Sequence, residues 1–171
     1  MTYSHSLAQT EDSKETDTNF GNHKSLANGV QKSDKVILRE GLPHQTFERE
    51  LLDQELKSKK TVKFNEFPYY GESLQLKEGD AKKLTALFCD PKSFEPFLGY
   101  KKCGGFHPDY CIEWQVGKEV YRAHICFGCH EMKCFGPKAE LYCDISDDAY
   151  KQLEEILHSY RKNRPQPKDE K

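Results

Sequence analysis

Cysteine is concentrated in one part of this 171-residue chain. Six of the seven cysteines lie between Cys103 and Cys143. Among them, Cys126 and Cys129 are separated by two residues, and His130 follows directly. A Cys-x-x-Cys-His run is the attachment sequence of haem c, and its two thiols also suit a zinc site or a redox pair. These three chemical hypotheses compete with a plain alternative, in which the side chains only pack.

Haem c would use both thiols as covalent attachment points and His130 as an axial iron ligand. That attachment normally takes place outside the cytosol, whereas the N-terminus shows no apolar export segment. No second axial ligand stands out, because Met132 is too close in the sequence and is expected to face the core. A haem-c electron carrier therefore ranks third among the hypotheses.

Zinc would use Cys126 and Cys129 as half of a tetrahedral site, since two intervening residues let both thiolates reach one ion. The other ligands would come from Cys103 and His107, which precede the first strand of the cysteine-rich region, and from His124. Zinc suits thiolate and imidazole ligands best among the common metals. A second Cys-x-x-Cys pair is absent from the sequence, which weakens this hypothesis.

Thiol chemistry is the remaining hypothesis. Cys126 and Cys129 could cycle as a redox pair, or Cys111 could be activated by His124 with Asp109 nearby. Strands are expected on both sides of the Cys-x-x-Cys, whereas a thioredoxin-like motif leads from a strand into a helix. A thiol redox enzyme is therefore the alternative to a non-catalytic domain with a zinc or thiol site.

The elements that position these residues are two predicted hairpins. Residues 109–116 and 119–127 alternate in polarity around Gly117-Lys118, which suits a type II′ turn. The register that follows places four pairs opposite each other: Trp114 and Tyr121, Ile112 and Ala123, Glu113 and Arg122, and Cys111 and His124. A shift of one residue would mix the apolar and polar faces, so the pattern favours this register.

A second hairpin is predicted from residues 131–135 and 140–145. It places Cys134 opposite Leu141 and Met132 opposite Cys143. Because a buried cysteine behaves as a small apolar side chain, we expect Cys134 and Cys143 to be core thiols.

The remaining patterns predict an α+β fold. An antiparallel meander of about four strands would be covered by a C-terminal helix that begins after Ser146, beside an N-terminal helical half with helices near 43–59 and 80–89. Residues 35–163 would form a single domain. The polar segments 1–34 and 164–171 contain too few large apolar residues to offset chain entropy, and we expect them to be disordered tails.

Composition limits the partners and the compartment. The net charge is −2 and no basic stripe alternates with aromatic residues, so no nucleic-acid binding is expected. No apolar run approaches the length of a membrane span, and a soluble cytoplasmic chain is expected because no signal peptide is visible. In a reducing cytosol the cysteines would be thiols or metal ligands. The sequence indicates neither a substrate nor a partner.

Four motifs resemble the pattern of a family of small, uncharacterised bacterial proteins. They are Gly41-Leu-Pro-His44, Lys102-Cys-Gly-Gly-Phe-His-Pro-Asp109, Ile125-Cys-Phe-Gly-Cys-His-Glu131 and Asn163-Arg-Pro165. The resemblance covers about residues 38–165. It implies no activity, because none is established for that family. Cys111, Cys134 and Cys143 have no place in its pattern, which fits their interpretation as packing residues.

Overall fold

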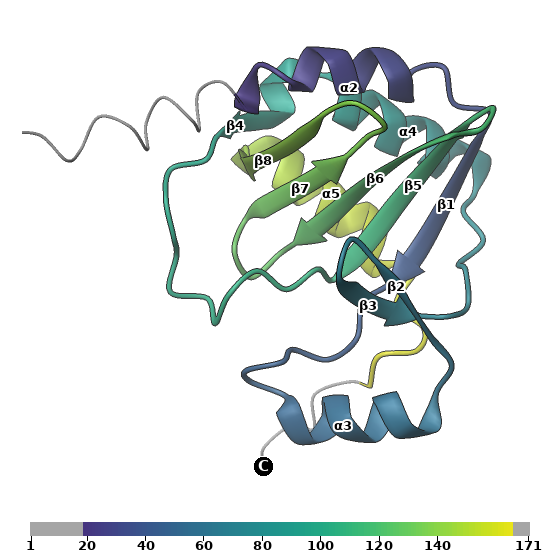
Figure 1. Ribbon diagram of the computed structural model, residues 1–171, viewed down its shortest axis with the longest axis vertical. Coiled ribbons are helices and arrows are strands. Elements are labelled where there is room, and N and C mark those ends of the chain that lie inside the picture. Colours follow the sequence, from purple (N-terminus) through teal and green to yellow (C-terminus); the bar gives the residue numbers. More distant parts are fainter. Residues whose placement is uncertain (1–18, 166–171) are drawn as a thin grey trace, which may run out of the picture.

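The structure, a computed structural model, describes residues 19–165 and has the predicted α+β architecture. Its main element is a six-stranded antiparallel sheet of order β1-β5-β6-β7-β8-β4, with the C-terminal helix α5 (Asp147–His158) behind it (Figure 1). The strands are β1 (Lys35–Glu40), β4 (Phe94–Pro96), β5 (Tyr110–Val116), β6 (Glu119–Cys126), β7 (Glu131–Phe135) and β8 (Glu140–Ile145).

The predicted meander is confirmed as β5 to β8, and it has the predicted register. Trp114 lies opposite Tyr121, Cys111 opposite His124, and Cys134 opposite Leu141. The apolar pattern fixes this register because every second side chain must enter the core. Two strands from other parts of the chain extend the meander at its edges: β1 pairs with β5, and β4 pairs with β8.

The hydrophobic core lies between one sheet face and three helices: α2 (His23–Val30), α4 (Glu78–Cys89) and α5. Trp114 is fully buried there, together with Cys134 and Cys143, as predicted. Ser146 caps α5 by accepting a hydrogen bond from the backbone N–H of Ala149.

The prediction of disordered tails is wrong for the tail residues that the structure describes. Residues 23–30 form α2, whose Leu26 and Val30 are 1% and 0% exposed. Three apolar residues on one helix face, Leu26, Ala27 and Val30, are enough to bury this short element against an existing sheet, although they could not form a core alone. Arg164 is also part of the fold, through ion pairs described below. Residues 1–18 and 166–171 lie outside the described residues.

The predicted N-terminal helical half is wrong as well, because helices alternate with strands along the chain. The helix predicted over 43–59 is shorter, α3 (Arg49–Ser58), and it lies at one end of the molecule (Figure 1). After α3 the chain forms a hairpin of β2 (Thr61–Phe64) and β3 (Phe67–Tyr70). Its turn residues Asn65 and Glu66 both have positive φ, as a type I′ turn requires.

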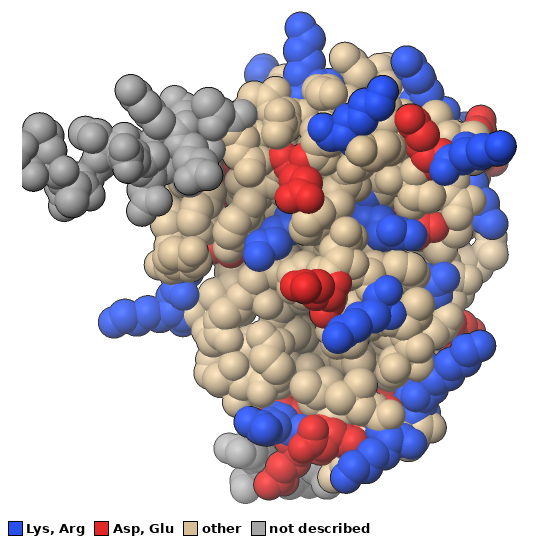
Figure 2. Space-filling view, in the orientation of Figure 1, with Lys and Arg blue, Asp and Glu red and all other residues tan. Residues whose placement is uncertain are grey.

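The second sheet face, which we call the outer face, is lined by the polar and cysteine side chains of the meander. The β2–β3 hairpin lies in front of it, and the 97–109 loop, which joins β4 to β5, runs beside and below it (Figure 1). Positive and negative side chains alternate across this side of the molecule without a large patch of either sign (Figure 2). Within residues 19–165, no helix has the length and apolar character that crossing a bilayer requires.

Candidate functional site

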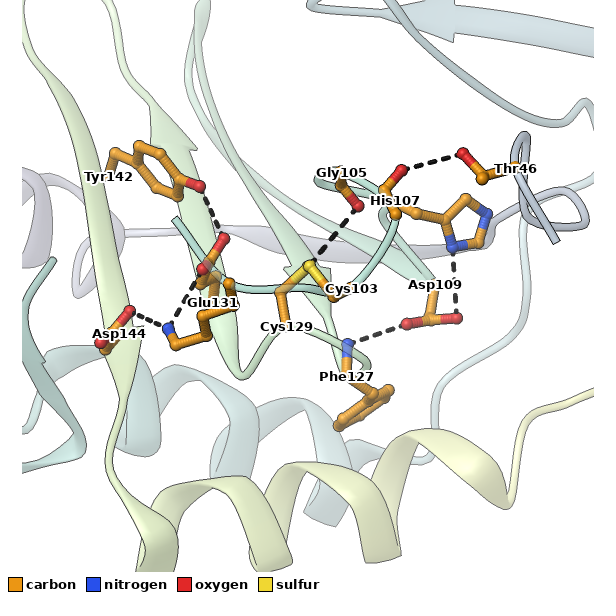
Figure 3. The surroundings of a disulfide bond; sticks show 12 residues. Thr46, Cys103, Gly105, His107, Asp109, Phe127, Cys129, Glu131, Tyr142 and Asp144 are labelled. Atoms are coloured by element: carbon orange, nitrogen blue, oxygen red, sulfur yellow. Dashed lines mark hydrogen bonds and ion pairs between the residues drawn. A yellow bond between two sulfur atoms is a disulfide. The ribbon is translucent and has the colours of Figure 1, made fainter. Parts of the chain in front are cut away.

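The centre of the candidate site is a disulfide between Cys103 and Cys129 (Figure 3). Cys103 comes from the 97–109 loop, and Cys129 from the turn between β6 and β7; their Cα atoms are 5.6 Å apart. The bond fastens the loop to the end of the meander across a sequence separation of 26 residues. Two of the five candidate zinc ligands are therefore bonded to each other, and the expectation that all cysteines are thiols or metal ligands is wrong for this pair.

The disulfide is packed against a loop backbone that only glycine can form easily. Gly104 and Gly105 have φ values of +77° and +93°. A side chain at Gly104 would collide with the rings of His44 and Phe47. The carbonyl oxygen of Gly105 lies 3.6 Å from the Cys129 sulfur, a van der Waals contact, because a disulfide sulfur carries no hydrogen to donate.

Lys101 anchors the same loop to the outer face of the sheet. Its Nζ lies 2.6 Å from Asp144 and 3.1 Å from Glu131, which are opposite each other on β8 and β7 (Figure 3). Tyr142 donates a second hydrogen bond to Glu131, at 2.6 Å. Burial alone would lower the pKa of Lys101, but the two carboxylates raise it. Both carboxylates are nearly inaccessible, and they share this one lysine as their cation.

His107 is held at the other end of the loop by hydrogen bonding. Its Nε2 donates to the carbonyl oxygen of Leu42 at 2.7 Å, and its Nδ1 lies 3.6 Å from Asp109. Burial lowers the pKa of His107, so its ring is neutral at pH 7. Asp109 also accepts the backbone N–H of Phe127, which ties the loop to the β6–β7 turn (Figure 3).

Arg164 completes a partly buried ion network that sequence reasoning missed. Its guanidinium donates to Asp109 at 2.7 Å and to Glu48 at 2.6 Å. Burial alone would raise the pKa of Glu48, but the backbone N–H of His44 and the guanidinium hold it below the usual value. Glu40, only 1% exposed, accepts the backbone N–H groups of residues 162–164 and so fixes the chain that delivers Arg164.

Only one sequence signal pointed to this network. The Asn163-Arg-Pro165 motif belonged to the quoted resemblance, yet the low apolar content of the segment placed Arg164 in a tail. No spacing rule along the sequence connects Glu40 with Arg164, because Arg164 follows it by 124 residues.

Cys126 is a free thiol that lies beside the disulfide. It is 2% exposed, and the backbone N–H groups of His107 and Cys129 point at its sulfur. Burial raises the pKa of Cys126 to about 11, in spite of these two donors. The structure thus brings four of the five candidate ligands together, Cys126, Cys129, Cys103 and His107, with Cys103 rather than Cys126 as the partner of Cys129.

His124 belongs to a separate cluster on the outer face. Its Nδ1 is hydrogen-bonded to the Tyr69 hydroxyl, and its Nε2 lies 3.0 Å from Asn65. Burial lowers the pKa of His124 to about 3, so the ring is neutral. Burial also raises the pKa of Cys111, the residue opposite, to about 12, so this pair does not form an activated thiolate.

The zinc and haem hypotheses receive no geometric support. Among residues 19–165, no three His, Cys, Asp or Glu side chains converge as a metal site would require. His130 has a φ of +56° and stacks on Tyr150, with ring centroids 3.8 Å apart. Haem c would also need the Cys129 sulfur, which the disulfide occupies.

Comparison with known proteins adds little to this geometry. No protein-family model matches the chain, and neither does any curated protein. A crystal structure of a putative lipoprotein from Clostridium perfringens aligns with 81% of this chain and 91% of its own, at 14% sequence identity and a TM-score of 0.40. A likeness at this level is too distant to assign a family or a function. The resemblance to small bacterial proteins stays a prediction.

Proposed function

We propose that this chain is a non-catalytic domain of an oxidising compartment, in which the Cys103–Cys129 disulfide fixes the 97–109 loop as a contact surface. The disulfide is the observation that carries the proposal. Disulfides persist in oxidising compartments and are rare in the cytosol, where thiols are kept reduced. The compartment proposed here therefore replaces the cytoplasmic location expected from the sequence.

The state of the polar groups supports a non-catalytic role. A catalytic acid or base needs a pKa near the working pH and a free position facing a substrate. Here Glu131 and Asp144 share Lys101, while Asp109 is held by Arg164 and a backbone N–H. A thiol that attacks an external substrate needs a lowered pKa and an open position, whereas Cys111 and Cys126 are buried and burial raises the pKa of both. Each group is engaged in a contact that stabilises the fold.

The fixed loop also has the character of a binding surface. Leu98 is 79% and Tyr100 95% exposed, and Phe47, whose ring lies over Gly104, is 69% exposed. Aromatic residues such as Tyr100 and Phe47 are enriched at protein interfaces, and tyrosine is also enriched among the residues that dominate binding energy. A covalent bond and two ion pairs hold this loop in place, which lowers the entropy cost of binding a partner.

The experiment is thiol counting on protein purified without reductant. After denaturation and alkylation, we expect five modified cysteines before reduction and all seven after it. Peptide mapping should assign the bond to Cys103 and Cys129. The same sample is measured for bound zinc and for a Soret band. Seven reactive thiols before reduction, a stoichiometric metal ion or a haem spectrum would each contradict the proposal.

A further inference from the structure

Three cysteines come together at the β6–β7 turn: Cys126 and Cys129 stand three positions apart on it, and Cys103 is bonded to Cys129. Cys126 is the last residue of β6, and Cys129 lies in the turn that precedes β7. The backbone N–H of Cys129 points at the Cys126 sulfur, so the free thiol lies against the residue whose sulfur is already bonded to Cys103. No other described cysteine has this position: Cys89 ends α4, Cys134 and Cys143 face the helices, and Cys111 lies in the next row of the outer face, opposite His124.

From this arrangement we propose that the site holds two interchangeable disulfides, with Cys126 acting as an internal nucleophile toward Cys129. The inference rests on the proposed Cys103–Cys129 bond and assigns a reaction to it. The Cys126 sulfur attacks the Cys129 sulfur, the bond to Cys103 breaks, and Cys103 leaves with the electron pair. The proton lost by Cys126 is taken up by Cys103. One disulfide and one thiol are present before and after, so the exchange needs no oxidant or reductant.

The surroundings favour Cys126 as the attacking group and Cys103 as the leaving group. Cys126 and Cys129 are 2% and 1% exposed, so an external thiol cannot reach either sulfur easily. Two N–H donors, from His107 and Cys129, stabilise negative charge on the Cys126 sulfur. Cys103 is only partly buried, which allows solvent to stabilise the departing thiolate.

The exchange would be slow at neutral pH. Thiolate is the reacting form, and burial raises the pKa of Cys126 to about 11. Its thiolate fraction, and with it the exchange rate, therefore rises about tenfold for each pH unit below that value.

The consequence concerns the 97–109 loop. With Cys126 bonded to Cys129, the loop loses its covalent attachment and keeps only contacts such as the ion pairs of Lys101. The Cys103 thiol then becomes available on the loop surface. The exchange is thus a means of releasing the proposed contact surface without any net change in oxidation state.

Three variants test the exchange: Cys103→Ser, Cys126→Ser and the double variant. Each is refolded in a buffer of reduced and oxidised glutathione and mapped by mass spectrometry, with circular dichroism as the check on folding. We expect Cys103→Ser to contain a Cys126–Cys129 disulfide, Cys126→Ser to keep the Cys103–Cys129 bond, and the double variant to have neither. Free thiols or only glutathione adducts at Cys126 and Cys129 in folded Cys103→Ser would overturn the inference.

A trapping experiment on the unmodified chain does not depend on any variant folding. At pH 9, iodoacetamide should label Cys103 progressively while a Cys126–Cys129 disulfide accumulates, and Cys103 should stay unlabelled in Cys126→Ser. Equal labelling of Cys103 in the two proteins would refute the exchange. If the unmodified protein lacks the Cys103–Cys129 bond from the start, the proposed function fails. If the bond is present but never moves, only the exchange fails.

Discussion

The contribution of the Cys103–Cys129 bond to stability can be calculated from its position. Cross-linking residues separated by 26 positions restricts the unfolded chain and contributes about 3.5 kcal/mol at 25 °C by the loop-entropy relation. Domains of this size are typically stable by about 5–15 kcal/mol, so the bond would supply a large share. We therefore expect its loss to move urea unfolding to a much lower midpoint.

The comparison that isolates the bond is between Cys126→Ser and Cys103→Ser/Cys126→Ser. Both lack Cys126, so its own contribution cancels and no alternative Cys126–Cys129 bond can form. Urea unfolding followed by circular dichroism should give a difference of about 3.5 kcal/mol between the oxidised proteins. The difference should vanish when both are reduced. A difference below about 1 kcal/mol, or one that survives reduction, would refute the assignment of the bond as the main fastening of the loop.

Three further predictions test other parts of the structure. Arg164→Ala should lower the free energy of unfolding, measured in urea, by about 3 kcal/mol, because it leaves two carboxylates without their cation. Arg164→Lys should lower it less. Equal losses in the two variants would argue against two paired carboxylates at Arg164. Leu26→Ala should lower the free energy of unfolding by about 3 kcal/mol, and the exposed control Ser25→Ala by about 0.5 kcal/mol or less. Equal small effects of the two substitutions would contradict the packing of α2 against the sheet. His124 has a lowered pKa of about 3 in the fold, so below its unfolded value of about 6.5 the unfolded chain binds more protons. The stability that neutral His124 provides is present above that unfolded pKa and lost as pH falls, by about 1.4 kcal/mol per pH unit. His124→Gln should remove that part of the pH dependence of unfolding, and an unchanged slope would contradict it.

The meander could be predicted in detail because its determinants are local. Alternation of apolar residues with a period of two, and a two-residue turn at Gly117-Lys118, together fix which residues face each other. The same reasoning correctly placed Cys134 and Cys143 in the core. The β2–β3 hairpin escaped it because Asn65-Glu66 is not a typical type I′ turn sequence, and Pro68 resembles the end of a strand.

The two ends of the folded chain were mispredicted for a different reason. Composition describes whether a segment could form a core by itself, whereas α2 and Arg164 join a core that other segments have built. Leu26 and Val30 gain their burial from the sheet, and Arg164 gains its ion pairs from Glu48, directly before α3, and from Asp109 at the end of the 97–109 loop. Contacts between segments so far apart in the chain cannot be predicted from the residues near each segment.

By itself, the sequence determined which residues of the meander lie opposite each other, such as Cys111 and His124 or Cys134 and Leu141. Strand register decides this, and register follows from a pattern that can be read along the chain. Only the tertiary structure decided which sulfurs bond. That choice depends on how the 97–109 loop approaches the β6–β7 turn, since Lys101 anchors the loop and Gly104 bends it. A difference of a few ångströms in this approach decides whether Cys103 can bond to Cys129.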